Sequence, residues 1–221
     1  MQTSPYQPIL LRLLHGAAAV LVLTALGSGY WVYSTFDRRW GRLTLPNLGD
    51  IQGIHGTIGL TFLLILPVFA LYSFHLGYRR LVQAQSLADL NQVGKPIWWI
   101  SLHRLANTQM LVAAALSVVT GRMMKEEWLP AGELNHPWYL AHLAAWLLMI
   151  GSLALHLLLG AKVGGLPLLA SILKLPVRAE DQPRSWLQGM IVKQPSLIVG
   201  LIEIIVIGGI AIAFVLPAFA A

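Results

Sequence analysis

Long apolar segments alternate along the chain with short segments that carry most of the charges. Five of the apolar segments reach the length of about 20 residues that crosses the hydrocarbon core of a bilayer. They predict transmembrane helices at about residues 9–33, 51–76, 97–121, 138–161 and 196–216. We therefore expect an all-α integral membrane protein with a four-helix transmembrane bundle and a fifth, C-terminal transmembrane helix.

Prolines mark the predicted helix boundaries. Pro96, Pro137 and Pro195 each precede an apolar segment, where proline suits the first turn of a helix. Pro67 falls inside the second segment and predicts a kink there. The expected organisation is a core over residues 1–165, an inner-face loop over 166–195 and an additional helix over 196–221. Residues 166–175 within the loop are expected to form a short helix at the membrane interface.

Composition agrees with a membrane protein. Hydrophobic residues make up 57% of the chain and charged residues only 11%, whereas about a quarter of a soluble domain is charged. The absence of cysteine excludes thiolate-bound iron–sulfur clusters, covalent c-type haem and disulfides. The net charge is +6, and the basic residues lie in loops beside the apolar segments. They are therefore expected to set the membrane topology and to contact lipid headgroups, and no nucleic-acid partner is expected.

The cations are unequally divided between the two sides of the predicted membrane. Ten fall on the side of the amino terminus, namely Arg12, Arg79, Arg80, Lys95, Arg104, Lys162, Lys174, Arg178, Arg184 and Lys193. Five fall on the other side, namely Arg38, Arg39, Arg42, Arg122 and Lys125. The positive-inside rule then predicts a cytoplasmic or stromal amino terminus and a carboxyl terminus on the opposite face. The membrane is a bacterial plasma membrane or a thylakoid.

Two histidines on the fourth apolar segment are spaced to face one side of a helix at two depths. His142 and His156 are 14 residues apart, which corresponds to a residual rotation of about 40° and a rise of about 21 Å. His15 in the first segment matches the depth of His156, and His55 in the second matches that of His142. We therefore predict the axial ligands of two non-covalent b-type haems, in the pairs His15 with His156 and His55 with His142.

Two alternatives explain the same histidines. They can be core histidines bonded to backbone carbonyls or hydroxyls, or ligands of a zinc-like metal, although zinc ligands cluster more tightly than these pairs. His103 is a competing ligand at the inner depth, or a hydrogen-bond donor to a propionate or a quinone. Glycines near the proposed haem planes, such as Gly29, permit a close approach of the haem to the backbone.

Other polar residues have candidate roles around these planes. Arg12, Arg104 and Lys162 flank the inner haem and are candidates to pair with its propionates, or they only set topology. His75 is expected at the interface. Glu203, inside the fifth segment, is a candidate proton relay or helix contact.

Several stretches resemble the prokaryotic di-haem cytochromes of the b561 type, over about residues 8–165. They are Arg12-Leu13-Leu14-His15, His55-Gly56-Thr57-Ile58-Gly59, His103 with Thr120-Gly121, and the fourth segment with its two histidines. The same family includes the cytochrome b subunits of nickel–iron hydrogenases and formate dehydrogenases. The resemblance implies the same two histidine pairs, and a third-helix histidine that is not an axial ligand. The chain departs from the pattern in its fifth segment, in its long loop, and in Gly16, which stands where a tryptophan is usual.

We expect the chain to transfer electrons across the membrane and to exchange them with a quinone or a redox protein, either as an electron carrier or as a quinone-linked oxidoreductase. The side chains considered for a quinone site are Trp128, His136 and Trp138 on the outer side, and His75 and His103 on the inner side. One alternative is an accessory or anchor subunit of a larger complex, or a homodimer, with structural or relay haems. Another is a transporter without haem.

Overall fold

The computed structural model describes residues 6–174, 177–178, 181–182, 186 and 196–216. These residues form helices and connecting loops and contain no strand, so the predicted all-α class is confirmed. The elements are α1 (Ile9–Phe36), α2 (Ile51–His75), the 3-10 turn η1 (Tyr78–Arg80), α3 (Ala84–Asp89), α4 (Pro96–Arg122), α5 (Pro137–Ser171) and α6 (Leu197–Val215).

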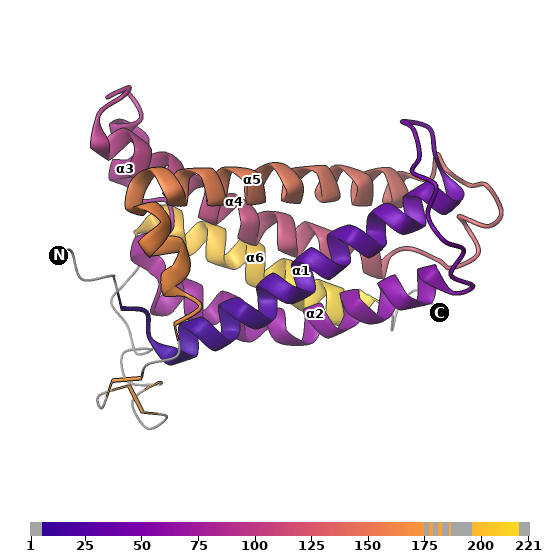
Figure 1. The fold of residues 1–221 in the computed structure, drawn as a ribbon, viewed down its shortest axis with the longest axis horizontal. Coiled ribbons are helices and arrows are strands. Elements are labelled where there is room, and N and C mark those ends of the chain that lie inside the picture. The colour runs from indigo at the N-terminus through magenta and orange to yellow at the C-terminus, as the bar shows by residue number, and fades with distance from the viewer. Residues whose placement is uncertain (1–5, 175–176, 179–180, 183–185, 187–195, 217–221) are drawn as a thin grey trace.

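The five long helices run roughly along one axis and form a bundle (Figure 1). One end of the bundle carries the start of α1, the η1–α3 connection and the end of α5, and we call it the inner end. The opposite end carries the loops that follow α1 and α4, and we call it the outer end. Helix α6 begins at the inner end and finishes at the outer end (Figure 1).

Four of the described helices, α1, α2, α5 and α6, are long and apolar enough to cross a membrane. Helix α4 has 27 residues and is about 40 Å long at 1.5 Å per residue, but His103, Arg104 and Asn107 lower its hydropathy. It packs against α5, α6 and α2, so protein surrounds much of it. All five predicted long helices are therefore present, and α4 is the most polar of them.

Helix α5 continues past the predicted end of the fourth segment at residue 161. Its backbone breaks at Gly165, which adopts a left-handed φ of 64° and a ψ of −174°, a conformation that suits glycine. Helical structure resumes as far as Ser171, so the first part of the predicted loop, residues 166–171, is a turned extension of α5. Pro137 and Pro96 occupy the first turns of α5 and α4 as predicted, whereas Pro195 lies outside the described residues.

The centre of the apolar core lies where α2, α4 and α6 meet. Leu63 and Leu66 of α2 and Val199 and Val206 of α6 are almost completely buried there. Helix α1 packs along α2, and α4 packs along α5, whereas α5 approaches α1 and α2 at few points. The bundle therefore consists of two helix pairs, α1 with α2 and α4 with α5, which meet through α2 and α4, with α6 closing the α2–α4 side.

Candidate functional site

The outer histidine pair bridges the two helix pairs. His55 lies on α2 and His142 lies on α5, and their ring centroids are 6.1 Å apart with the ring planes at 69°. Each comes from a helix of a different pair, so the two rings face each other across the space between the pairs.

The inner pair repeats this arrangement nearer the inner end. His15 on α1 and His156 on α5 have ring centroids 6.1 Å apart, with the planes at 36°. Phe69 of α2 lies at the edge of the His15 ring, with 6.4 Å between centroids. The spacing along the sequence thus brings together the two couples that it predicts.

The separation within each couple is the one that two imidazoles on a single metal ion require. Two metal–nitrogen bonds of about 2 Å and two half-rings of about 1 Å sum to a centroid separation of about 6 Å. Both couples have this spacing, and in each couple the two rings come from helices of different pairs.

The outer rings are held in one tautomer by hydroxyl groups. Ser28 Oγ lies 2.9 Å from His55 Nδ1 and also donates to the carbonyl of Thr24. Thr120 Oγ1 lies 2.9 Å from His142 Nδ1 and also donates to the carbonyl of Leu116. Each hydroxyl proton is already used, so each oxygen accepts from an Nδ1–H. The other ring nitrogen, Nε2, is then deprotonated and free to bind a metal.

An amide has the same role at the inner level. Asn107 Oδ1 accepts from His156 Nδ1 at 2.7 Å, and Asn107 Nδ2 donates to the carbonyl oxygen of Arg80 at 2.9 Å. The second bond determines which end of the amide faces the ring. His15 differs, because its Nδ1 is buried and has no hydrogen-bond partner among the described residues.

Two glycines make room for the outer rings. A Cβ on Gly29 of α1 would lie 3.1 Å from Cε1 of His55, and one on Gly121 of α4 would lie 3.2 Å from Cε1 of His142. Both separations are tighter than an ordinary contact, so glycine is the residue that fits without displacing the rings. The prediction that Gly29 lies at the outer level agrees with this position.

His103 lies beside His156 on the neighbouring helix α4, with 5.5 Å between ring centroids. This is shorter than in the two facing couples, and α4 and α5 belong to the same helix pair. His103 Nε2 is buried and has no hydrogen-bond partner among the described residues. The inner level therefore holds three imidazoles, of which His15 and His156 face each other from different helix pairs.

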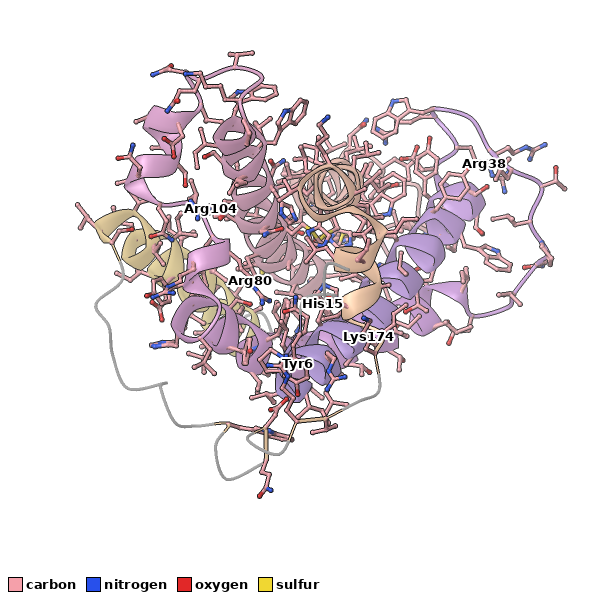
Figure 2. The ribbon with its side chains drawn as sticks, turned by 60° about the vertical axis from the view of Figure 1, so that its left-hand side comes forward. Tyr6, His15, Arg38, Arg80, Arg104 and Lys174 are labelled. Atoms are coloured by element: carbon pink, nitrogen blue, oxygen red, sulfur yellow. The ribbon has the colours of Figure 1, made fainter. Side chains whose placement is uncertain are left out.

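The cations that the sequence suggested for the inner level have other neighbours in the structure. Arg12 is buried and donates to the carbonyl of Lys174. Arg104 lies 3.3 Å from Ser86 of α3, and Lys162 lies 5.1 Å from the centre of the Trp99 ring. Figure 2 shows Arg80 between Arg104 and His15, at the inner end.

The remaining histidines lie outside the two couples. His75 Nε2 lies 2.9 Å from Glu203 Oε1, and this contact joins the end of α2 to α6. His136 caps α5 through the backbone nitrogen of Trp138 and stacks on Trp128 at 3.5 Å between centroids. Among the described residues, no group of three or more histidine or acidic side chains is arranged to hold a metal ion by itself.

The family model for prokaryotic cytochrome b561 matches residues 6–174. The chain belongs to the prokaryotic cytochrome b561 family. No curated protein and no solved structure matches it. The family comprises integral membrane cytochromes that bind b-type haem and transfer electrons, so the apolar helices and the haem expectation agree with it.

The described residues of this cytochrome fit a haem. The facing imidazoles have a separation that two ligands of one iron would have, and three of the four have an anchored Nδ1–H. Sequence reasoning missed Ser28 and Asn107, and it noted Thr120 only as part of a family motif. A signal was available, because each is a polar residue at the depth of a histidine in an apolar segment.

Proposed function

We propose that this cytochrome carries electrons across the membrane through two b-type haems, one held by His15 and His156 and the other by His55 and His142. The observation that carries the proposal is the repeated 6.1 Å ring separation at two levels. The two ligands of α5 lie 14 residues apart, about 21 Å along the helix, so the pairs lie toward opposite ends of the bundle.

The side chains of the site have two roles, because the histidines would bind the iron and their hydrogen-bond partners orient the histidine rings. When bound, haem supplies a reversible one-electron change at iron. The Nε2 atoms of the four histidines would bind the iron. Ser28, Thr120 and Asn107 hold the Nδ1 protons and so fix the ring orientation and raise the basicity of the ligands. The apolar walls of the helix pairs exclude water from the rings.

Haem content of single-histidine variants tests the ligand assignment. We expect about two haems per chain in the purified wild type, and one in His142→Ala and in His156→Ala, because each variant removes one axial ligand. His103→Ala is the matched control on a neighbouring helix and should retain both. A colourless wild type, or full haem content in both ligand variants, would refute the proposal.

We further propose a quinone as the exchange partner at the inner end. Quinone chemistry couples electrons to protons, so the exchange site needs a protonatable group at the depth of the membrane. The His75–Glu203 pair meets this need, because it lies on two apolar helices and both side chains remain partly exposed. A redox protein is the other candidate partner, and it would contact the loops.

Reduction of the haems by a quinol in the purified protein tests this step. Glu203→Gln should slow reduction by quinol several-fold while leaving reduction by dithionite and the haem content unchanged. Glu133→Gln, in the outer loop, is the control for a lost carboxylate. Equal quinol rates in wild type and Glu203→Gln would exclude the pair from the exchange site.

A further inference from the structure

We infer that Arg80, a residue outside the three ligand-bearing helices, binds a propionate of the inner haem and sets the reduction potential of that haem. The inference rests on the proposed function, because it requires a haem between His15 and His156. It assigns to Arg80 the role that the sequence suggested for Arg12, Arg104 and Lys162.

The backbone of Arg80 is connected to an inner ligand. Arg80 is the last residue of η1, in the connection between α2 and α4. Its carbonyl oxygen accepts from Asn107 Nδ2, and Asn107 Oδ1 accepts from His156 Nδ1. Two hydrogen bonds therefore separate the Arg80 main chain from the ring of His156, and they fix the place where its side chain starts.

The guanidinium of Arg80 lies at the inner haem level. It is close enough to the rings of His15 and His103 to interact with both electrostatically, and Figure 2 labels Arg80 and His15 at the same end of the bundle. Its Nη2 donates to Oε1 of Gln7 at 2.5 Å. Gln7 is buried just before α1, so its amide holds Nη2 of the Arg80 guanidinium in place. No bond of Nη1 or Nε of Arg80 to another described residue is seen.

This positive charge has no carboxylate partner among the described residues. No acidic side chain among the described residues forms an ion pair with Arg80, and its hydrogen-bond partner Gln7 is neutral. Arg80 is an exposed residue, and the partial burial of its guanidinium lowers its pKa. Its guanidinium is therefore available to bind an anion.

A haem propionate is that anion. Propionates are carboxylates on the edge of the macrocycle, and a guanidinium binds a carboxylate through two parallel hydrogen bonds. The three cations that the sequence suggested each have a different neighbour, in Lys174, Ser86 and Trp99. Arg80 is the cation whose backbone carbonyl is hydrogen-bonded to Asn107, the residue that orients His156.

An optical redox titration of the purified full-length protein tests the inference. In Arg80→Gln we expect the midpoint potential of one haem to fall, because a nearby positive charge favours the reduced state. That haem should also transfer to apomyoglobin about tenfold faster, the factor expected for the loss of a charge-assisted hydrogen bond. The other haem should not change.

The neighbouring arginine supplies the matched control. Arg79 is exposed and lies against Tyr78, so Arg79→Gln removes the same charge one residue away and should leave both potentials and both transfer rates unchanged. Arg80→Lys keeps the positive charge but cannot form the two parallel hydrogen bonds of a guanidinium. Its haem potential should therefore be close to that of the wild type, whereas its haem should still be lost faster. Arg80→Lys also tests the inference if Arg80→Gln does not fold.

Reconstitution with haem dimethyl ester completes the test. Esterification removes the propionate charges, so Arg80→Gln should have no additional effect on the inner site of the ester-loaded protein. Two haems with the same potentials in Arg80→Gln and Arg79→Gln would overturn this inference alone. A wild type with fewer than two haems would instead overturn the proposed function, and this inference with it.

Discussion

Each proposed ligand ring lies in an apolar environment where a polar nitrogen needs a partner. Ser28 and Thr120 have one proton each, and each donates it to a carbonyl of its own helix. They can therefore only accept from the imidazole. Asn107 reaches the same result with an amide oxygen. Three side chains of different chemistry thus select one tautomer, with the proton on Nδ1.

Removing these partners should affect one haem at a time. Thr120→Ala should weaken the outer site and Asn107→Ala the inner site, in each case by 10- to 100-fold in haem affinity, which is the usual cost of losing a second-shell partner. The measurement is the amount of haem retained during titration with apomyoglobin, with the two haems distinguished by their potentials.

Thr61→Ala is the control, because Thr61 donates only to the carbonyl of Thr57 on an exposed side of α2. It should behave as wild type. If Thr120→Ala and Asn107→Ala changed the same haem, the assignment of the two levels would be wrong.

A second prediction concerns the close approach of α1 to the outer ring. Gly29→Ala places a methyl group 3.1 Å from His55 Cε1, next to the indole of Trp146. The ring must turn or the helices must separate, at a cost of about 1–3 kcal/mol. We expect a broadened outer-haem spectrum and faster haem loss.

Gly27→Ala is the matched control two residues earlier, where a Cβ would meet nothing within 4 Å. It should leave the spectrum unchanged and slightly favour the helix. Identical spectra for Gly27→Ala and Gly29→Ala would show that the ring tolerates the methyl group.

The sequence was sufficient to predict which histidines meet, and insufficient to predict what orients them. The 14-residue spacing of His142 and His156 is a property of a single helix, so periodicity alone places both rings on one side. The partners Ser28 and Asn107 lie on other helices. Their contacts depend on how far each helix is rotated about its axis and how it crosses its neighbour, and a single sequence contains no direct measure of either.

At the scale of helices, apolar length predicted the position of all five long elements to within a few residues, except at the end of α5. There the apolar pattern weakens after residue 161, but the helix continues to Gly165, breaks at a left-handed glycine and resumes. Glycine and proline close together indicate a turn, and the helical residues 166–171 beyond it agree with the short helix expected over residues 166–175. The direction of this helix after the turn depends on what its residues pack against.

A third prediction concerns the attachment of α6, the fifth long helix, to the rest of the bundle. Gly209 faces α4, where a Cβ would meet Ala115 at 3.5 Å and Val119 at 3.7 Å, and this is the close small-residue packing that joins helices in membranes. Gly209→Leu should push α6 away and lower stability by about 1–3 kcal/mol. Both haems should remain, because no proposed ligand lies on α6.

Gly208→Leu is the adjacent control, since a Cβ there would meet nothing within 4 Å. The measurement is the thermal midpoint in detergent, followed through haem absorbance and through a thermal-shift dye. Equal midpoints for the two variants would mean that α6 does not depend on its contact with α4.

At the scale of the whole molecule, the family match ends between α5 and α6. The matched residues 6–174 contain α1 to α5 and all four proposed ligands. Helix α6 lies beyond them and is attached through the core and through the His75–Glu203 pair. If the cytochrome is instead a subunit of a larger complex, α6 is the natural docking element, and gentle purification should then recover the chain with partners.

The two ends of the bundle differ in charge, and this difference predicts the orientation of the two haem levels. Eight of the ten cations predicted for the inner side and all five predicted for the outer side lie within the described residues, whereas Arg184 and Lys193 lie outside them. The inner end, with His15 and His156, should therefore face the cytoplasm or stroma. The absence of cysteine makes a clean test, because one introduced thiol is the only thiol. Asn135→Cys, in the exposed loop before α5, should react with a membrane-impermeant maleimide in intact cells or right-side-out vesicles. Asn91→Cys, in the exposed loop before α4, should react only after the membrane is opened. The opposite labelling pattern would place the proposed quinone-exchange pair and Arg80 on the outer face, and would reverse the sidedness of electron entry.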